Sequence, residues 1–212
     1  MSTADPLPVN IVGGTGRRLL LLVHGYGADE HDLAPLAPMY DPEGRFFAVC
    51  PRGPLDVPPW GAGWYERDAA GRVDPHSFLS AVDRLDATID DLCASRGFQR
   101  DEAVVIGFSQ GGAMTLALSL RAGGGARPSA IACLSGMLQE PEGLRYAWDA
   151  PDLPPVLVQH GTLDPLVEIA RGHHVRDTLA AHGLEVSYAE YPMGHEIRPE
   201  GIADLRRWLA DR

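Results

Sequence analysis

The segment 107–112 reads Gly-Phe-Ser-Gln-Gly-Gly and sets a serine, Ser109, between glycines. A Gly-x-Ser-x-Gly pattern between a strand and a helix makes a sharp turn in which larger side chains would collide, so Gly107 and Gly111 leave the Ser109 hydroxyl exposed. A serine in such a turn is a candidate nucleophile for acyl transfer. The alternative is a glycine-rich helix start in which Ser109 only caps the helix.

A serine hydroxyl is a poor nucleophile at neutral pH and needs a base, for which the chain offers eight histidines. His195 follows the last predicted strand and is the candidate base, because it completes the chain order serine, acid, histidine. His24 lies too early for that order and is expected to organise its loop. His160, at the end of a strand, is expected to pack. The adjacent His173 and His174 face different sides of a predicted helix, so no metal site is expected.

A carboxylate must fix the tautomer of the base and stabilise its imidazolium form. Asp164 follows the strand predicted at 156–159, whereas Asp152 precedes that strand and lies at the wrong end of the sheet. Ser109, Asp164 and His195 each follow their own strand and are therefore predicted to form a catalytic triad. The alternative for Asp164 is a simple turn residue before a proline.

The oxyanion formed when the serine attacks needs two hydrogen-bond donors. The backbone N–H of Gln110, which follows the nucleophile, is predicted to be one of them. The segment 24–27 reads His-Gly-Tyr-Gly and is predicted to supply the other from the N–H of Tyr26.

Apolar and aromatic residues in loops at the same edge are candidates to line an acyl pocket, and the alternative for each is that it only packs its loop. The chain has no inserted block large enough for a separate lid domain. This predicts an open site for short or medium acyl chains. The candidate pocket residues are Trp60, Trp64, Tyr65, Met137, Leu138 and Trp148.

Short apolar runs alternate with longer amphipathic ones along the chain. Runs that are apolar throughout favour parallel strands covered by helices on both faces, so an α/β fold with a mainly parallel central sheet is predicted. In such sheets the sites form in loops beyond the carboxyl ends of the strands. The segment 51–73, rich in proline, glycine and tryptophan, is predicted to be a loop. Strands are predicted at 19–23, 46–50, 103–108, 130–134, 156–159 and 185–191, and helices at 77–96, 109–121, 168–182 and 200–210.

The chain has 212 residues, 45% of them hydrophobic, and a single domain over 1–212 is expected. The formal charge of -11 argues against nucleic acid as a partner. All 18 basic residues are arginine, which excludes a Schiff-base lysine and a Walker-type phosphate loop. No apolar run is long enough for stable membrane insertion, and the first residues lack the features of a secretory signal. Three widely spaced cysteines, Cys50, Cys93 and Cys133, are expected to be free thiols in a cytoplasmic protein.

Four segments in order resemble the phospholipase/carboxylesterase family, and the resemblance runs over about 18–209. The Phe-Ser-Gln-Gly-Gly form is much more specific than a bare Gly-x-Ser-x-Gly. The loop 51–73 matches the family only at its opening Pro-Arg-Gly-Pro and at its Trp-Tyr pair. The four segments are Leu-Val-His-Gly-Tyr-Gly at 22–27, Gly-Phe-Ser-Gln-Gly-Gly-Ala-Met at 107–114, His-Gly-Thr-Leu-Asp-Pro-Leu-Val at 160–167 and Gly-His-Glu-Ile at 194–197.

The resemblance implies an α/β-hydrolase fold, the triad Ser109, Asp164 and His195, and an oxyanion hole from Tyr26 and Gln110. It implies hydrolysis of carboxylic esters, and in some members thioesters or lysophospholipids, through an acyl-enzyme and without a cofactor. Three alternatives are a catalytically silent binding protein of the same fold, a peptidase, and a dienelactone-hydrolase-type enzyme, which would favour cysteine at position 109. The sequence does not decide the oligomeric state, and a homodimer is one candidate.

Overall fold

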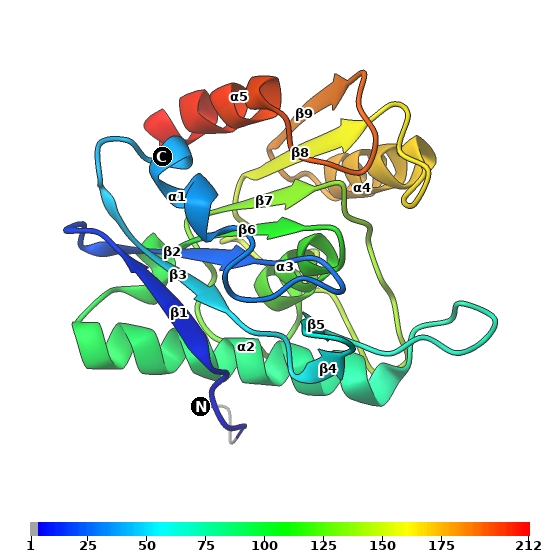
Figure 1. Cartoon of the computed structure of the whole chain (residues 1–212), viewed down its shortest axis with the longest axis horizontal. Helices are drawn as coiled ribbons and strands as arrows, with labels where there is room; N and C mark the ends of the chain where they lie inside the picture. The colour runs from blue at the N-terminus through cyan, green and yellow to red at the C-terminus, as the bar shows by residue number, and fades with distance from the viewer. Residues whose placement is uncertain (1–3) are drawn as a thin grey trace.

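A mainly parallel sheet forms the centre of the molecule (Figure 1). The structure is a computed structural model and describes residues 4–212. Its main strands are β1 (Val9–Gly13), β2 (Arg18–Val23), β3 (Phe46–Pro51), β6 (Val104–Phe108), β7 (Ala130–Leu134), β8 (Val156–Gly161) and β9 (Val186–Tyr191). Within residues 4–212 they make a seven-stranded sheet in the order β1-β3-β2-β6-β7-β8-β9. β1 runs antiparallel to β3, and the other neighbours pair in parallel.

The inner strands are apolar because both of their faces are covered. Leu19 to Leu22 in β2 are fully buried, and burying each leucine stabilises the fold by about 1.5–3 kcal/mol. The register pairs Leu20 with Val104 and Val23 with Gly107, so β2 and β6 end side by side. The loops that follow these strands therefore emerge at one edge of the sheet.

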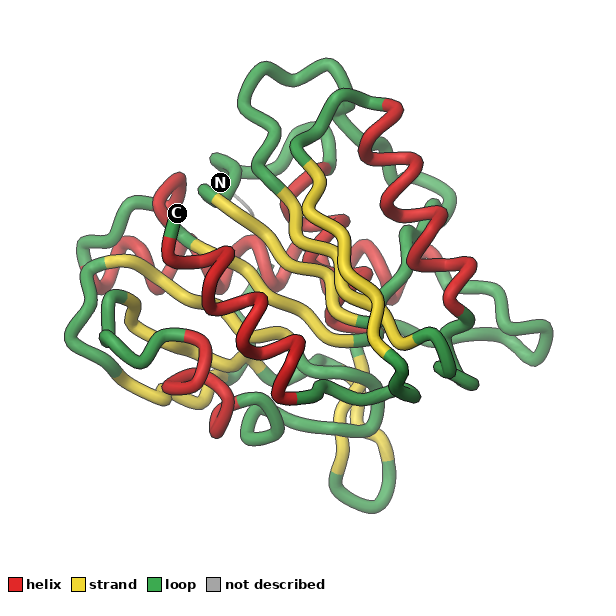
Figure 2. The backbone as a smooth tube through the Cα atoms, turned by 90° about the horizontal axis from the view of Figure 1, so that it is seen from above, coloured by secondary structure: helices red, strands yellow, loops and turns green. Residues whose placement is uncertain are grey.

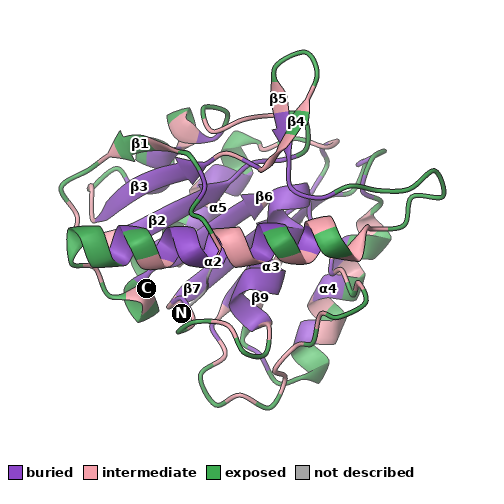
Figure 3. Ribbon diagram, turned by 90° about the horizontal axis from the view of Figure 1, so that it is seen from below, coloured by how far each residue is buried: buried purple, intermediate pink, exposed green. Residues whose placement is uncertain are grey.

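Helices cover both faces of the sheet. They are α1 (Ala37–Tyr40), α2 (Pro75–Arg96), α3 (Gln110–Leu120), α4 (Ile169–Ala181) and α5 (Pro199–Ala210), with short 3-10 helices η1 (Ala34–Leu36) and η2 (Arg100–Glu102). The buried residues of α2, α3 and α4 form a core on one face, and those of α1 and α5 form a core on the other. Figure 2 shows the C-terminal helix α5 lying across the strands, and Figure 3 shows α2 crossing them on the opposite side. The prediction of a mainly parallel sheet with helices on both faces is confirmed.

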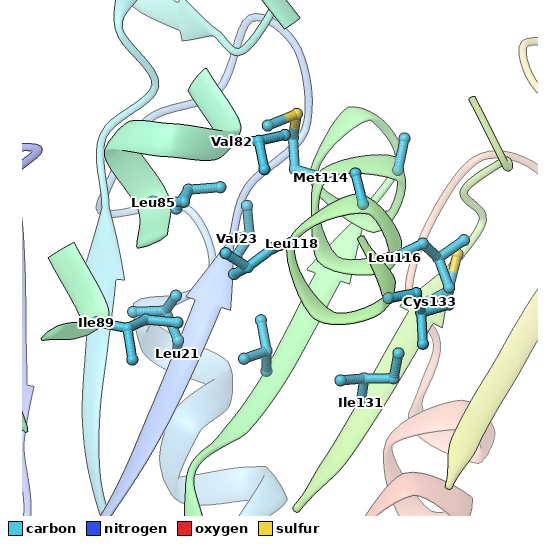
Figure 4. Close-up of a cluster of buried hydrophobic side chains, with 14 of the residues drawn as sticks. Leu21, Val23, Val82, Leu85, Ile89, Met114, Leu116, Leu118, Ile131 and Cys133 are labelled. Atoms are coloured by element: carbon cyan, nitrogen blue, oxygen red, sulfur yellow. The ribbon is translucent and has the colours of Figure 1, made fainter. Parts of the chain in front are cut away.

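The long helix α2 packs its apolar stripe against α3 and the sheet (Figure 4). The helix begins after Asp74, whose carboxylate accepts a hydrogen bond of 2.7 Å from the Ser77 N–H, and it ends at Gly97, whose φ of 71° is left-handed. Its stripe of buried residues recurs every three or four positions, as an amphipathic helix requires. The side chains that meet in this core include Val82, Leu85, Ile89, Met114, Leu118, Leu21 and Val23.

Some strands differ from the sequence prediction. β1 was not predicted, because it is an edge strand whose residues are only partly covered. The segment 51–73 also contains a small antiparallel hairpin of β4 (Leu55–Val57) and β5 (Gly61–Gly63). Two strands of only three residues each, in a segment rich in proline and glycine, carry no readable alternation. The three cysteines are buried free thiols, as expected. Among residues 4–212, every helix is too short or too polar to span a bilayer.

Candidate active site

Ser109 sits at the sharp turn between β6 and α3. Its backbone has φ 56° and ψ -117°, a strained conformation that non-glycine residues rarely adopt. A Cβ atom on Gly107 would collide with the carbonyl oxygen of Gly111, and one on Gly111 would collide with that of Val23. Both glycines are therefore required by the close approach of α3 to β6 and β2. Strain of this kind is typical of functional sites because the surrounding structure has to hold it in place.

The structure brings Ser109, Asp164 and His195 together from the ends of three strands. His195 Nε2 lies 2.8 Å from Ser109 Oγ, and His195 Nδ1 lies 2.7 Å from Asp164 Oδ2. In this arrangement the Ser109 hydroxyl can donate to Nε2, while Nδ1–H donates to the carboxylate. The Phe108 ring packs against the imidazole with a centroid distance of 4.8 Å. The geometry can pass a proton from Ser109 to His195 while Asp164 stabilises the charge that results.

The Asp164 carboxylate is fully removed from solvent, with 0% of its side chain exposed. Burial alone would raise the pKa of Asp164, but hydrogen bonds from the Val167 N–H, from His195 and from the Leu166 N–H outweigh it and hold that pKa below its usual value. The two amides donate to Oδ1 at 2.8 Å and 2.9 Å, which leaves Oδ2 to face His195. Asp164 is therefore an ionised, oriented acceptor at neutral pH.

Two residues that line the cleft with Ser109 have backbone N–H groups that could donate to a negative oxygen. In the described part of the chain, neither the Tyr26 N–H nor the Gln110 N–H donates to a protein acceptor. The Gln110 N–H lies in the first turn of α3, where helix N–H groups have no partner within the helix. Tyr26, Gln110 and Ser109 all line the same cleft. An oxyanion hole requires such a pair of donors next to the nucleophile.

The Gln110 side chain is linked through Trp64 to the loop that carries Tyr26. Its Oε1 accepts a hydrogen bond of 2.8 Å from the Trp64 N–H, and its Nε2 donates to the Tyr65 carbonyl at 3.0 Å. The Trp64 indole N–H in turn donates to the His24 carbonyl at 2.8 Å. All of these groups are buried, so we call Gln110, Trp64 and His24 the loop brace.

His24 organises its own loop, as the sequence predicts. Its Nδ1 lies 2.7 Å from the Gly25 carbonyl, and its Nε2 lies 3.0 Å from the Gly53 backbone N–H. A carbonyl only accepts and an N–H only donates, so the hydrogen of the ring is on Nδ1. Burial lowers the pKa of His24. The imidazole is therefore a neutral link between the loops at 24–27 and 51–53.

An open cleft of about 1340 Å³ lies over Ser109 and His195. Of the residues that the sequence suggests for an acyl pocket, Tyr65 and Met137 line this cleft. The others lie elsewhere. Trp64 is fully buried in the loop brace, and Leu138 belongs to the core. Trp60 is 83% exposed near the hairpin β4–β5, beside a separate hollow, and Trp148 stacks on His182 at 4.3 Å.

Several lining residues were not singled out from the sequence. Phe108 and Leu166 lie next to or near the predicted triad residues in the chain, so that neighbourhood could have suggested them. The hairpin residues and the two arginines carry no such indication, because their loops are brought to the cleft by tertiary contacts. The additional lining residues include Leu55, Val57, Arg67, Phe108, Leu166 and Arg171.

Comparison with known proteins decides the family. Residues 11–211 match the model of the phospholipase/carboxylesterase family. The chain belongs to this family. The phospholipase/carboxylesterase family has the α/β-hydrolase fold, and the chain is accordingly an enzyme, a serine hydrolase of carboxylic esters.

Individual known proteins resemble the chain over most of its length. A probable carboxylesterase of Oryza sativa subsp. japonica is 27% identical, with 96% of this chain and 81% of the rice protein covered. Acyl-protein thioesterase 1 of Neurospora crassa is 28% identical, with 91% of this chain and 86% of that protein covered. The crystal structure of esterase PE8 superposes with a TM-score of 0.81 at 27% identity, covering 99% of both chains.

Proposed function

We propose that the protein hydrolyses small carboxylic esters or thioesters through an acyl-enzyme formed on Ser109. The observation that carries the proposal is the hydrogen-bonded series from Ser109 Oγ to His195 Nε2 and from His195 Nδ1 to Asp164 Oδ2. A buried carboxylate, an oriented imidazole and a strained, accessible serine are the parts that a serine nucleophile needs.

In the first half of the reaction, Ser109 Oγ attacks the carbonyl carbon of the ester while its proton passes to His195 Nε2. The negative oxygen of the tetrahedral intermediate accepts hydrogen bonds from the N–H groups of Tyr26 and Gln110. Each donor lowers the barrier by about 3 kcal/mol. When the bond between the carbonyl carbon and the leaving oxygen or sulfur breaks, His195 gives its proton to the alcohol or thiol that departs.

In the second half, water attacks the acyl-enzyme. His195 Nε2 takes a proton from the water as its oxygen bonds to the carbonyl carbon. The intermediate then collapses, the bond from Ser109 Oγ to carbon breaks, and the proton on His195 returns to Ser109. The products are a carboxylic acid and the free enzyme, so no cofactor is required for the balance of the reaction.

The lining of the cleft favours an acyl group of short or medium length. Leu55, Val57, Met137 and Leu166 offer apolar surface for an acyl chain. Charged residues such as Asp56, Arg67 and Arg171 also line the cleft, so the apolar surface is interrupted and suits a short chain better than a long one. The curated relatives include proteins named for carboxylesterase and for thioesterase activity, so oxyesters and thioesters are both candidates.

The test is turnover of p-nitrophenyl acetate and of an acyl thioester by the wild type and by Ser109→Ala and His195→Ala. We expect both substitutions to reduce turnover by about 10⁴-fold or more while the fold is kept. Wild-type protein that turns over neither substrate, yet binds esters, would support the alternative of a silent binding protein. An amide or peptide cleaved much faster than any ester would support a peptidase, and a strong preference for dienelactones would support that alternative.

A further inference from the structure

A buried histidine lies directly behind the Asp164 carboxylate and takes no part in the proposed reaction. His160 is the second-to-last residue of β8 and lies four residues before Asp164 in the chain. None of its surface is exposed to solvent. The sequence alone suggests only that it packs. Its polar contacts, however, lie on the loop 164–167.

His160 holds this loop through one hydrogen bond. Its Nε2 lies 2.7 Å from the Val167 carbonyl oxygen, and because a carbonyl only accepts, Nε2 carries the hydrogen. The N–H of the same Val167 donates to Asp164 Oδ1 at 2.8 Å. His160 thus holds the carbonyl group of Val167, and the N–H group of the same residue orients the Asp164 carboxylate. The same Nε2 also lies 3.8 Å from Asp164 Oδ2, the oxygen that faces His195.

The opposite edge of the ring is pressed against helix α4. A Cβ atom on Gly172 would lie 2.7 Å from His160 Nδ1. Because glycine has no Cβ, helix α4 can pack directly against the imidazole. Within the described residues, Nδ1 has no hydrogen-bond partner. A buried polar atom without a partner costs stability, and an apolar side chain of similar size would avoid that cost. Core packing alone therefore does not account for a histidine at this position.

We propose that His160 is a positioning residue that keeps the Asp164 carboxylate aligned with His195 by clamping the loop 164–167. The inference rests on the proposed function, because it assigns His160 a role through Asp164. His160 touches neither the substrate nor the reacting atoms. It acts through Val167, and helix α4 keeps its ring from turning away.

The test compares His160→Met with His160→Gln. Methionine fills the space without a donor, whereas the glutamine Nε2 can donate to the Val167 carbonyl. We expect His160→Met to lower kcat by about tenfold to hundredfold, the range expected when a catalytic group is slightly misplaced, with KM nearly unchanged. His160→Gln should recover most of this loss. Equal losses in both variants would overturn the proposal.

A double-mutant cycle separates positioning from general loosening. We expect His160→Met to have almost no further effect on kcat in an Asp164→Asn background, because the group it orients no longer supports His195. A loss of full size in that background would contradict the proposal. If Asp164→Asn by itself leaves turnover intact, the proposed function fails first, so the two failures are distinguishable.

Two further variants guard against a protein that does not fold. Gly172→Ala pushes on the ring from α4 and should lower kcat in the same direction as His160→Met. Gln159→Met is the matched control, because Gln159 is the buried neighbour of His160 and its amide bonds to Tyr191 and to the Gly201 carbonyl instead. It should lower the thermal midpoint while kcat stays within about threefold of wild type. A kcat loss in Gln159→Met as large as that in His160→Met would overturn the proposal.

Discussion

The loop brace predicts that the Gln110 side chain matters for catalysis, although only the backbone N–H of Gln110 is proposed to bind the substrate oxygen. Gln110→Met keeps that N–H and the approximate volume of the side chain. It removes both buried hydrogen bonds and leaves the Trp64 N–H and the Tyr65 carbonyl without partners. Each unpaired buried group costs about 1–3 kcal/mol, so the free energy of unfolding should fall by about 2–6 kcal/mol.

The effect on turnover follows from the oxyanion hole. An oxyanion-hole donor contributes about 3 kcal/mol, which corresponds to a factor of about 10² in rate. A donor that is displaced loses part of this contribution. We expect Gln110→Met to reduce kcat by about tenfold to hundredfold, measured on p-nitrophenyl acetate at a temperature where the variant remains folded. Urea unfolding of the same preparation gives the change in stability.

The matched control is again Gln159→Met, a second buried glutamine whose side-chain amide makes two hydrogen bonds away from the cleft. It should lose stability to a similar extent and keep kcat within about threefold of wild type. If the two variants lose stability equally and also lose kcat equally, the loop brace has no specific role in catalysis and the reasoning is refuted.

Three further predictions concern the triad and the cleft. Asp164→Asn should keep the fold and lower kcat by about 10³–10⁴-fold, and near-normal ester turnover in this variant would be incompatible with the proposed role of Asp164. Because the folded pKa of Asp164 lies below its unfolded value, its ionised form stabilises the fold above about pH 4, and this contribution is lost as pH falls through the folded pKa. The difference in unfolding free energy between wild type and Asp164→Asn should therefore shrink as pH falls below about 4, and a difference that grows there would reverse the sign of this argument. In a series of p-nitrophenyl esters, kcat/KM should peak at a short or medium acyl chain, and a clear maximum at long chains would count against an open, partly charged cleft.

The apolar runs made most of the sheet predictable. The strand at 130–134 was predicted with the bounds it has, because its residues are apolar throughout and covered on both faces. The strand β1 and the hairpin β4–β5 were not predicted, because an edge strand and two three-residue strands leave no clear pattern. What places them is pairing with distant parts of the chain.

The relative positions of Ser109, Asp164 and His195 could be inferred from the sequence because each follows a strand of a parallel sheet, and such strands end at one edge. The role of Trp64 could not be inferred in this way. An aromatic residue in a loop near the site suggests a pocket wall, but Trp64 is buried and donates to the His24 carbonyl, forty residues away. The contact between His160 and Val167 is equally invisible in the sequence, since it depends on how the loop 164–167 folds back.

The most direct measurement is to treat the wild-type protein with a fluorophosphonate and to identify the modified residue by peptide mass spectrometry. We expect a single adduct on the Ser109 hydroxyl, formed with loss of esterase activity and absent from Ser109→Ala. An adduct on another residue, or full ester turnover by Ser109→Ala, would contradict acyl transfer through this serine.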